Sequence, residues 1–175
     1  MIPMMSPPVA TLSTDACVIA AAQQFSVGAD LMLAIRSHER GRPGFANGNT
    51  DGSHDYNEPG LNTRTVIELI SGGWIAQRLA YDGCYAMNAS AYWMRARLLD
   101  QAGSHMPLLQ RAARYHSKTL VYNIRYQEKI KQPMLDWACH LYHFWRIDAQ
   151  GLFAVAANLV SERELQICQP RLNPY

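Results

Sequence analysis

The sequence has little charge and no long apolar run. Asp, Glu, Lys and Arg make up 17% of its 175 residues. No stretch reaches the ~20 consecutive apolar residues that a membrane-spanning helix needs. The 16 Lys and Arg residues are scattered, and the formal net charge is only +2. Nucleic-acid-binding proteins usually carry a dense basic patch, so we expect no nucleic-acid partner. Because no apolar run is long enough, we also expect no transmembrane segment.

Strand-like alternation is nearly missing as well, whereas hydrophobic residues make up 49% of the chain. Such a fraction is enough for the core of one domain of ordinary size. Apolar residues recur mostly at helical spacing, which predicts a mainly α protein. We expect a loose Pro-rich arm over residues 1–13, a helical domain over residues 14–132 and a helical, aromatic-rich extension over residues 133–175. Pro133 would mark the last boundary. The first residues lack the positive segment of an export signal, so none is evident.

One long polar segment, residues 41–62, interrupts the helical pattern. It reads GRPGFANGNTDGSHDYNEPGLN and is rich in Gly, Asn, Asp and Ser. Irregular segments of this length in a compact domain are usually functional. The Asp51–Gly52 pair is a turn signal that allows a short β-hairpin inside it.

Glu39 is the main candidate for chemistry, because it ends an apolar helix that we expect to begin near Asp30. Leu31, Ile35 and Glu39 are spaced i, i+4, i+8, so the acid shares the core-facing stripe. Gly41 suits a left-handed stop to this helix. A carboxyl in apolar surroundings keeps its proton to a higher pH. The alternative is an ordinary solvated acid at a helix end.

Several motifs follow one another along residues 15–131: CVIAAAQQFSVGADLMLAIRSHERGRPG, NGNTDGSHD, LNT, DGC and AARYHSKT…YNIRYQEKI. In this order and spacing they resemble the soluble lytic transglycosylases, in particular the group encoded with type IV secretion, conjugation and pilus systems. The resemblance implies a lysozyme-like fold with a long irregular active-site loop. It also implies cleavage of the β-1,4 bond between N-acetylmuramic acid and N-acetylglucosamine in peptidoglycan, leaving a 1,6-anhydro end, with no metal or cofactor.

The resemblance also assigns roles to individual residues. Glu39 takes the place of the catalytic acid. The substrate-binding or Glu-orienting positions fall on Ser53, Asp55, Asn62, Tyr115 and His116. Two positions depart from the family pattern, because Asn57 replaces a glycine and Gly60 stands where a glutamine usually binds sugar.

The proposed chemistry requires Glu39 to be protonated at working pH, although an exposed Glu has a pKa near 4.3. We expect burial against Met32, Ile35 and Phe45 to raise its pKa by ~2 units. A cation beside the carboxyl would oppose that shift. Three arginines should therefore point outward, towards the anionic stem peptides of the wall: Arg36, Arg40 and Arg42.

Four cysteines allow two disulfides in three pairings. The resemblance implies a Cys17–Cys84 bond, and Cys139 and Cys168 are a second candidate pair. Such bonds need an oxidising compartment, which fits the bacterial periplasm.

The segment ACHLYH brings Cys139 together with His140 and His143, a grouping that could suggest a metal site. The helix that carries it offers no further ligands. We therefore expect a packed helix face and no metal there.

Two other functions stay open at this point. A hydrolase of the same fold would need a second carboxylate, for which Asp55 and Glu58 are the loop candidates; otherwise Asp55 would stabilise the turn by bonding backbone amides. A non-catalytic wall-binding module is favoured by Gly60 in place of the glutamine. The expected partners are peptidoglycan strands and, by the resemblance, components of an envelope-spanning secretion apparatus.

Overall fold

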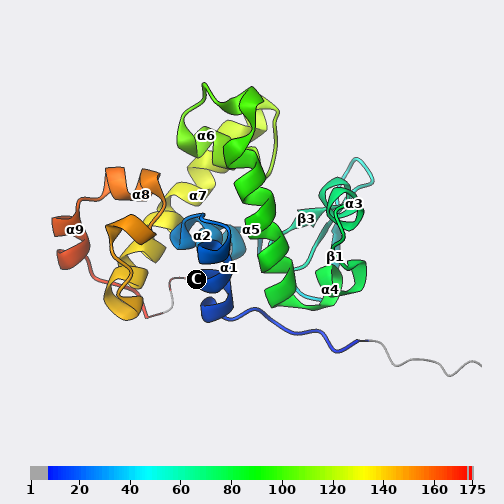
Figure 1. Cartoon of the computed structure of the whole chain (residues 1–175), viewed down its shortest axis with the longest axis horizontal. Helices are drawn as coiled ribbons and strands as arrows, with labels where there is room; N and C mark the ends of the chain where they lie inside the picture. Colours follow the sequence, from blue (N-terminus) through cyan, green and yellow to red (C-terminus); the bar gives the residue numbers. More distant parts are fainter. Residues whose placement is uncertain (1–7, 173, 175) are drawn as a thin grey trace, which may run out of the picture.

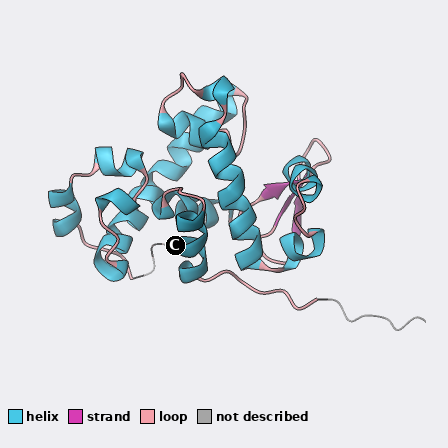
Figure 2. Cartoon of the chain, viewed as in Figure 1, coloured by secondary structure: helices cyan, strands magenta, loops and turns pink. Residues whose placement is uncertain are grey.

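The computed structural model describes residues 8–172 and 174, and its order of elements is mainly helical (Figures 1 and 2). The N-terminal half contains α1 (Asp15–Gln24), α2 (Ala29–Glu39), β1 (Ala46–Gly48), β2 (His54–Tyr56), β3 (Leu61–Asn62), α3 (Thr63–Ser71), α4 (Ala76–Tyr81) and α5 (Gly83–Leu99). The C-terminal half contains η1 (Gln101–Gly103), α6 (Leu108–Ala113), α7 (Leu120–His140), η2 (Leu141–Trp145), η3 (Ala149–Gly151), α8 (Ala154–Leu159) and α9 (Glu162–Ile167). The expectation of a mainly α fold with a short hairpin is confirmed.

Helix α2 is the centre of the core. Residues 31–35 are completely buried, and α1 and α7 pack against this helix. In Figure 1, α1 and α2 lie in the middle, with the sheet on one side and α8 and α9 on the other. An apolar helix that is covered on several sides can hold a polar group at its end away from bulk water.

A small antiparallel sheet occupies the long polar segment, in the order β1-β2-β3. Asp55 lies opposite Asn47 on one neighbouring strand and opposite Asn62 on the other. The turn between β1 and β2 contains Gly52 at φ +80°, a left-handed conformation that glycine adopts readily. The Asp51–Gly52 signal therefore predicted this hairpin correctly.

Helix α7 corrects the boundary expected at Pro133, because it runs from Leu120 to His140 with the proline inside it. Proline within a helix costs about 3 kcal/mol, since it removes a hydrogen bond and crowds the preceding turn. Ile130 and Met134 are fully buried on either side, and Trp137 is almost so. Their packing on α2 offsets that cost and keeps the helix continuous.

The C-terminal extension is attached to the core through buried contacts. The backbone N–H of Phe153 donates to Oδ1 of Asp30 over 2.6 Å, and both residues are buried. The ring Nδ1 of His140 is hydrogen-bonded to the carbonyl of Arg171 over 2.8 Å. These contacts pack residues 141–172 on the domain.

The N-terminal arm is also attached where it is described. Thr11 N–H donates to the carbonyl of Tyr81, and Gly83 N–H donates to the carbonyl of Thr11. Ser13 N–H donates to Glu58 Oε2 over 2.6 Å. The expectation of a loose arm is therefore wrong for residues 11–13, while residues 1–7 lie outside the described residues.

Two disulfides are present, Cys17–Cys84 and Cys139–Cys168. The first joins α1 to the start of α5 and closes 67 residues, which stabilises the fold by about 4 kcal/mol in the chain-entropy model. The disulfides expected from the sequence are thus present. None of the helices formed by the described residues has the length and apolar character needed to cross a membrane.

Candidate active site

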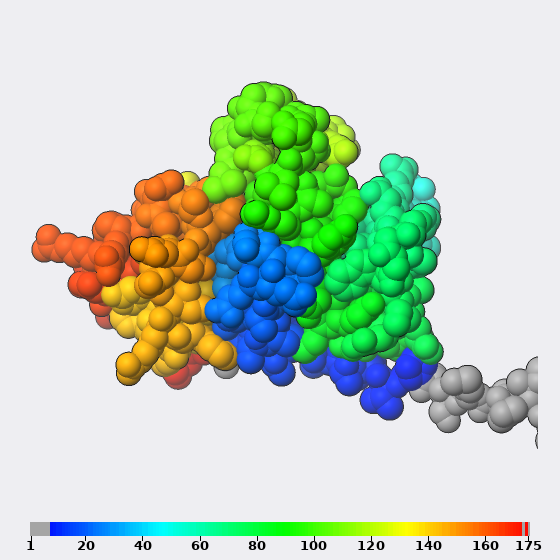
Figure 3. Space-filling view, in the orientation of Figure 1, coloured from blue at the N-terminus to red at the C-terminus, as the bar shows by residue number. Residues whose placement is uncertain are grey.

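A cleft of about 790 Å³ lies between the sheet and α3 on one side and α5, residues 114–119 and the start of α7 on the other. Its two rims face each other in the space-filling view, where residues 49–68 form one and residues 93–122 contribute to the other (Figure 3). All six site residues expected from the sequence line it: Glu39, Ser53, Asp55, Asn62, Tyr115 and His116. The fold thus brings together side chains that are up to 77 positions apart (116 − 39).

Glu39 ends α2 at the wall of the cleft and is partly buried. Burial raises the pKa of its carboxyl from 4.5 to about 7, because the charged form loses hydration. The nearby Asp55 charge also raises this pKa, whereas a hydrogen bond from Tyr126 and the charge of Lys129 lower it. The upward shift expected from the sequence is present, so a large share of Glu39 is protonated at neutral pH.

Tyr126 is the site residue that the sequence did not reveal. Its hydroxyl donates to Glu39 Oε1 over 2.7 Å, and its ring is buried in α7. The ring stacks on His116 with centroids 4.6 Å apart and meets His38 edge-on at 5.4 Å. The sequence shows only that Tyr122 and Tyr126 share a helical spacing, which does not indicate that one of them reaches a residue 87 positions away.

Phe45 does not belong to the apolar surroundings of Glu39, contrary to expectation. Its side chain is 67% exposed, whereas Met32 and Ile35 are fully buried. Phe45 lies just before β1 in the long polar segment, and nothing in the sequence distinguished it from a buried aromatic. Tyr126 takes the place beside the carboxyl instead.

Asp55 is held by side-chain amides on both of its oxygens. Asn49 Nδ2 donates to Oδ2 and Asn62 Nδ2 donates to Oδ1, each over 3.0 Å. These bonds come from side chains in the turn after β1 and on β3, whereas the expected turn-stabilising role would have used backbone amides. The carboxylate is therefore fixed in orientation at the cleft wall.

Ser53 and Asn62 belong to the same polar network. The Ser53 hydroxyl donates to Asp51 Oδ1 over 2.6 Å and accepts from Asn62 Nδ2 over 3.0 Å. The Oδ1 atom of Asn62 also accepts from the Arg64 N–H and so caps α3. These residues fix the shape of the loop and engage the Ser53 hydroxyl in its hydrogen bonds.

Tyr115 and His116 act on the site in different ways. The Tyr115 hydroxyl is buried, donates to the carbonyl of Pro59 over 2.8 Å and is hydrogen-bonded to Ser90 Oγ over 2.8 Å. Tyr115 therefore holds the loop that leads into Gly60. His116 stacks on Tyr126, and burial lowers its pKa, so the ring is neutral at neutral pH.

Gly60 lies directly against the carboxyl of Glu39. A Cβ placed on Gly60 would lie 2.8 Å from Glu39 Oε2, and its backbone has φ +60°. The carboxyl of Glu39 thus occupies the space that a side chain at position 60 would need. Asn57 also has a positive φ of 59°, which asparagine tolerates better than most residues.

Two of the three arginines expected to point away from Glu39 make other contacts. Arg36 pairs with Asp15, and Arg40 Nε donates to the carbonyl of Ser37. Arg40 itself adopts the left-handed conformation that ends α2, with φ 50°, so the helix stop expected at Gly41 is displaced by one residue. Neither cation is paired with Glu39, nor is Arg42 among the cleft residues.

Glu58 is not a candidate for a second carboxylate. It is 7% exposed, and its Oε2 accepts from the backbone of Ser13 rather than facing the cleft. Of the two loop acids considered for a hydrolase, only Asp55 lines the cleft.

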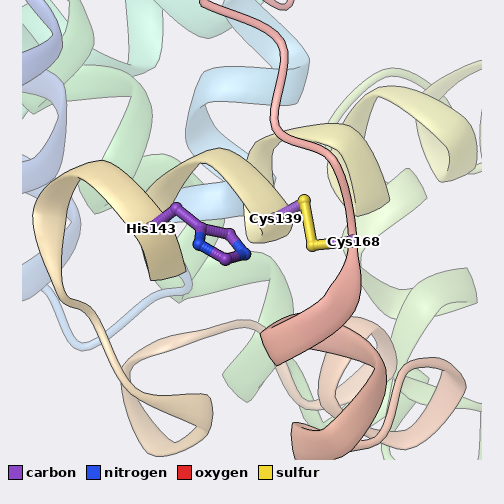
Figure 4. Close-up of side chains that lie close together, drawn as sticks. All are labelled: Cys139, His143 and Cys168. Atoms are coloured by element: carbon purple, nitrogen blue, oxygen red, sulfur yellow. A yellow bond between two sulfur atoms is a disulfide. The ribbon is translucent and has the colours of Figure 1, made fainter.

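Cys139, His143 and Cys168 place their ligand atoms within 4.8 Å of one another (Figure 4). The two sulfur atoms are joined in a disulfide, and the thiolate is the form of cysteine that binds metals. The His143 Nε2 atom is hydrogen-bonded to the carbonyl of Leu165 over 2.8 Å. This cluster therefore fastens α9 to the end of α7.

Neither a scan of the sequence against models of known protein families nor a search among curated proteins finds a match.

Proposed function

We propose that this protein is a lytic transglycosylase that cleaves the β-1,4 bond between N-acetylmuramic acid and N-acetylglucosamine in peptidoglycan. One observation carries the proposal: a carboxyl with a pKa of about 7, Glu39, lies at the wall of a cleft large enough for a glycan strand. A general acid is most effective when its pKa lies near the operating pH.

In the first step, neutral Glu39 donates its proton to the glycosidic oxygen. Because Oε1 accepts from Tyr126, Oε2 beside Gly60 is the oxygen that carries this proton. The C1–O bond breaks, and the N-acetyl group of the sugar supports the positive charge that develops at C1.

In the second step, ionised Glu39 takes the proton of the C6 hydroxyl, and O6 attacks C1 to form the 1,6-anhydro ring. The Tyr126 hydroxyl stabilises the carboxylate during this interval by its hydrogen bond. The cycle returns Glu39 to its neutral form.

A hydrolase is the second candidate, and the position of Asp55 favours it. This carboxylate lines the same cleft as Glu39, and two amides fix it in place. Glycosidases that hydrolyse such bonds ordinarily use a pair of carboxylates.

Digestion of purified peptidoglycan followed by mass spectrometry distinguishes the two reactions. We expect anhydro ends from the wild type, no turnover from Glu39→Gln, and substantial turnover from Asp55→Asn. Reducing ends, together with inactive Asp55→Asn, would establish the hydrolase instead. Glu39→Gln should still bind peptidoglycan, and a wild type that binds without cleaving would indicate a wall-binding module.

The proposed setting is the periplasm, where the enzyme would open local gaps for an envelope-spanning secretion or conjugation apparatus. Two disulfides support an oxidising compartment. The resemblance to the group encoded with secretion and conjugation systems supports the association with such an apparatus.

A further inference from the structure

Arg97 on α5 places its guanidinium at the cleft wall, where the side chain is partly buried. Its Cζ lies 3.9 Å from the ring centroid of Trp93, which is 8% exposed, and both residues line the cleft. The stacked indole restricts the guanidinium and fixes its plane. Its Nε atom is buried without a hydrogen-bond partner.

The described residues 8–172 and 174 give Arg97 no ion pair, although acidic side chains are near. Asp100 is engaged by Arg114, whose Nη2 lies 2.6 Å from Asp100 Oδ2. Burial lowers the pKa of Arg97, while the charges of Glu68 and Asp100 oppose this shift. The cost of partly burying this cation is therefore only partly offset by the chain itself.

Arg114 adds a second guanidinium to the same wall. It is also a cleft residue, is nearly buried, and lies close enough for its charge to lower the pKa of Arg97. Its Nε atom has no hydrogen-bond partner either. Because Arg114 is paired with Asp100, Arg97 is the guanidinium of the two that can bind an anion without breaking an ion pair of the described residues.

We propose that Arg97, oriented by Trp93 and supported by Arg114, binds a carboxylate carried by the substrate. The inference rests on the proposed function and deepens it, because N-acetylmuramic acid carries a lactyl arm with a carboxyl group, either free or extended by a peptide that has its own carboxylates. A planar guanidinium binds a carboxylate through two parallel hydrogen bonds. Arg97 would thereby distinguish muramic-acid glycans from chitin-like strands that carry no carboxylate.

Binding measurements in a Glu39→Gln background test this subsite without relying on turnover. The probes are peptide-bearing peptidoglycan oligosaccharides, the same strands after amidase treatment, and chitin oligosaccharides of equal length. We expect the carboxylate-bearing strands to bind about 10-fold more tightly than chitin, because hydrogen bonds to charged groups contribute that much or more. Tight binding of the peptide-bearing strands alone would assign the peptide carboxylate, and tight binding of both would assign the lactyl arm.

Adding Arg97→Gln should abolish this preference and leave the binding of chitin unchanged. Arg97→Lys should keep only part of the preference for carboxylate-bearing strands, because an ammonium cannot form the two parallel hydrogen bonds of a planar guanidinium. The matched control is Arg95→Gln, two positions away on α5, whose side chain donates to the carbonyl of Ser26 outside the cleft and should keep the preference.

Equal affinity for all three probes, including no binding at all, would overturn the inference. So would a loss of affinity for chitin and peptidoglycan alike in Arg97→Gln, since that result would indicate a purely structural arginine. A wild type that cleaves no peptidoglycan while the preference persists would overturn the proposed function and leave the subsite standing.

Discussion

At Glu39, burial and a hydrogen bond act on the pKa in opposite directions. Burial raises the pKa, the Tyr126 hydroxyl lowers it, and the net value of about 7 shows that burial prevails. The hydrogen bond nevertheless decides where within the neutral range the acid titrates. Tyr126 is therefore the residue through which the pH profile can be changed without altering the acid itself.

Tyr126→Phe removes the hydroxyl and keeps the ring that stacks on His116. Because the lost hydrogen bond favours the charged form, the pKa of Glu39 should rise by about 1 unit. The alkaline limb of the pH profile of kcat should move up by the same amount, as measured on peptidoglycan between pH 5 and 9. Tyr122→Phe, one turn earlier on α7, is the control and should leave the limb in place. A limb that moves downward would contradict this account.

Gly60→Ala should reduce turnover strongly, because the new Cβ would lie 2.8 Å from Glu39 Oε2. The substitution also imposes a positive φ on alanine, which costs roughly 1–2 kcal/mol. Gly52→Ala separates the two effects: its φ is +80°, but nothing lies within 4 Å of its Cβ. We expect both variants to lower the melting temperature and only Gly60→Ala to lower kcat by 10-fold or more. Equal kcat values would show that the contact with Glu39 is unimportant.

Glu39 could be found from the sequence because its signal is local. The spacing from Leu31 through Ile35 is enough to place it on the buried stripe of one helix. Tyr126 could not be found in this way, since it reaches Glu39 only through the packing of α7 on α2, and one sequence carries no sign of that pairing.

Among the elements, α7 shows how packing overrides a local preference. Pro133 predicts the end of a helix, yet the helix continues because Ile130, Met134 and Trp137 are buried against the core. The helix carries Tyr126 beside Glu39 and Cys139 at the extension. A single element thus connects the two regions that the sequence had separated.

The start of α2 is linked to the extension by a buried carboxyl. Asp30→Ala would leave the Phe153 N–H without its acceptor, which should destabilise the protein by about 1–3 kcal/mol. Hydrogen exchange should speed up first in α8, which follows Phe153. Asp148→Ala removes an exposed cap of η3 and should have a much smaller effect on urea unfolding. Unchanged exchange in α8 would show that this bond does not hold the extension.

For the whole molecule, the raised pKa of Glu39 implies that stability falls as the pH rises. The folded pKa is about 7 and the ordinary value is 4.5, so the native state binds more protons between these limits. The free energy of unfolding should therefore decrease across this window, by up to about 3 kcal/mol. Asp30, whose pKa is raised to about 7 by burial, contributes with the same sign.

Glu39→Gln measures how much of the pH dependence of stability comes from Glu39. The variant should match the wild type near pH 4 and exceed it by about 3 kcal/mol at pH 8, because it has no charge to bury. Urea unfolding at both pH values, followed by circular dichroism, measures the difference. Glu128→Gln removes an exposed carboxyl on α7 and serves as the control, because its charge is not buried and the variant should match the wild type at both pH values. A variant less stable than the wild type at pH 8 would contradict this prediction.

Some features of the whole molecule could be predicted from the sequence, and others could not. The mainly α class and the hairpin follow from patterns that a single sequence carries, whereas only the resemblance implied the Cys17–Cys84 bond, because four cysteines allow three pairings. The attachment of the arm at Thr11 and of the extension at Asp30 depends on hydrogen bonds between distant segments, which composition and spacing do not encode.

The continuity of α7 has a practical consequence for anyone who shortens this protein to a minimal unit. A cut at the proline would remove Met134 and Trp137, whose indole N–H donates to Ser37 Oγ on the helix that ends in Glu39. Such a fragment would expose the apolar side of α2 to solvent. Any truncation from the C-terminus therefore has to leave α7 complete as far as His140.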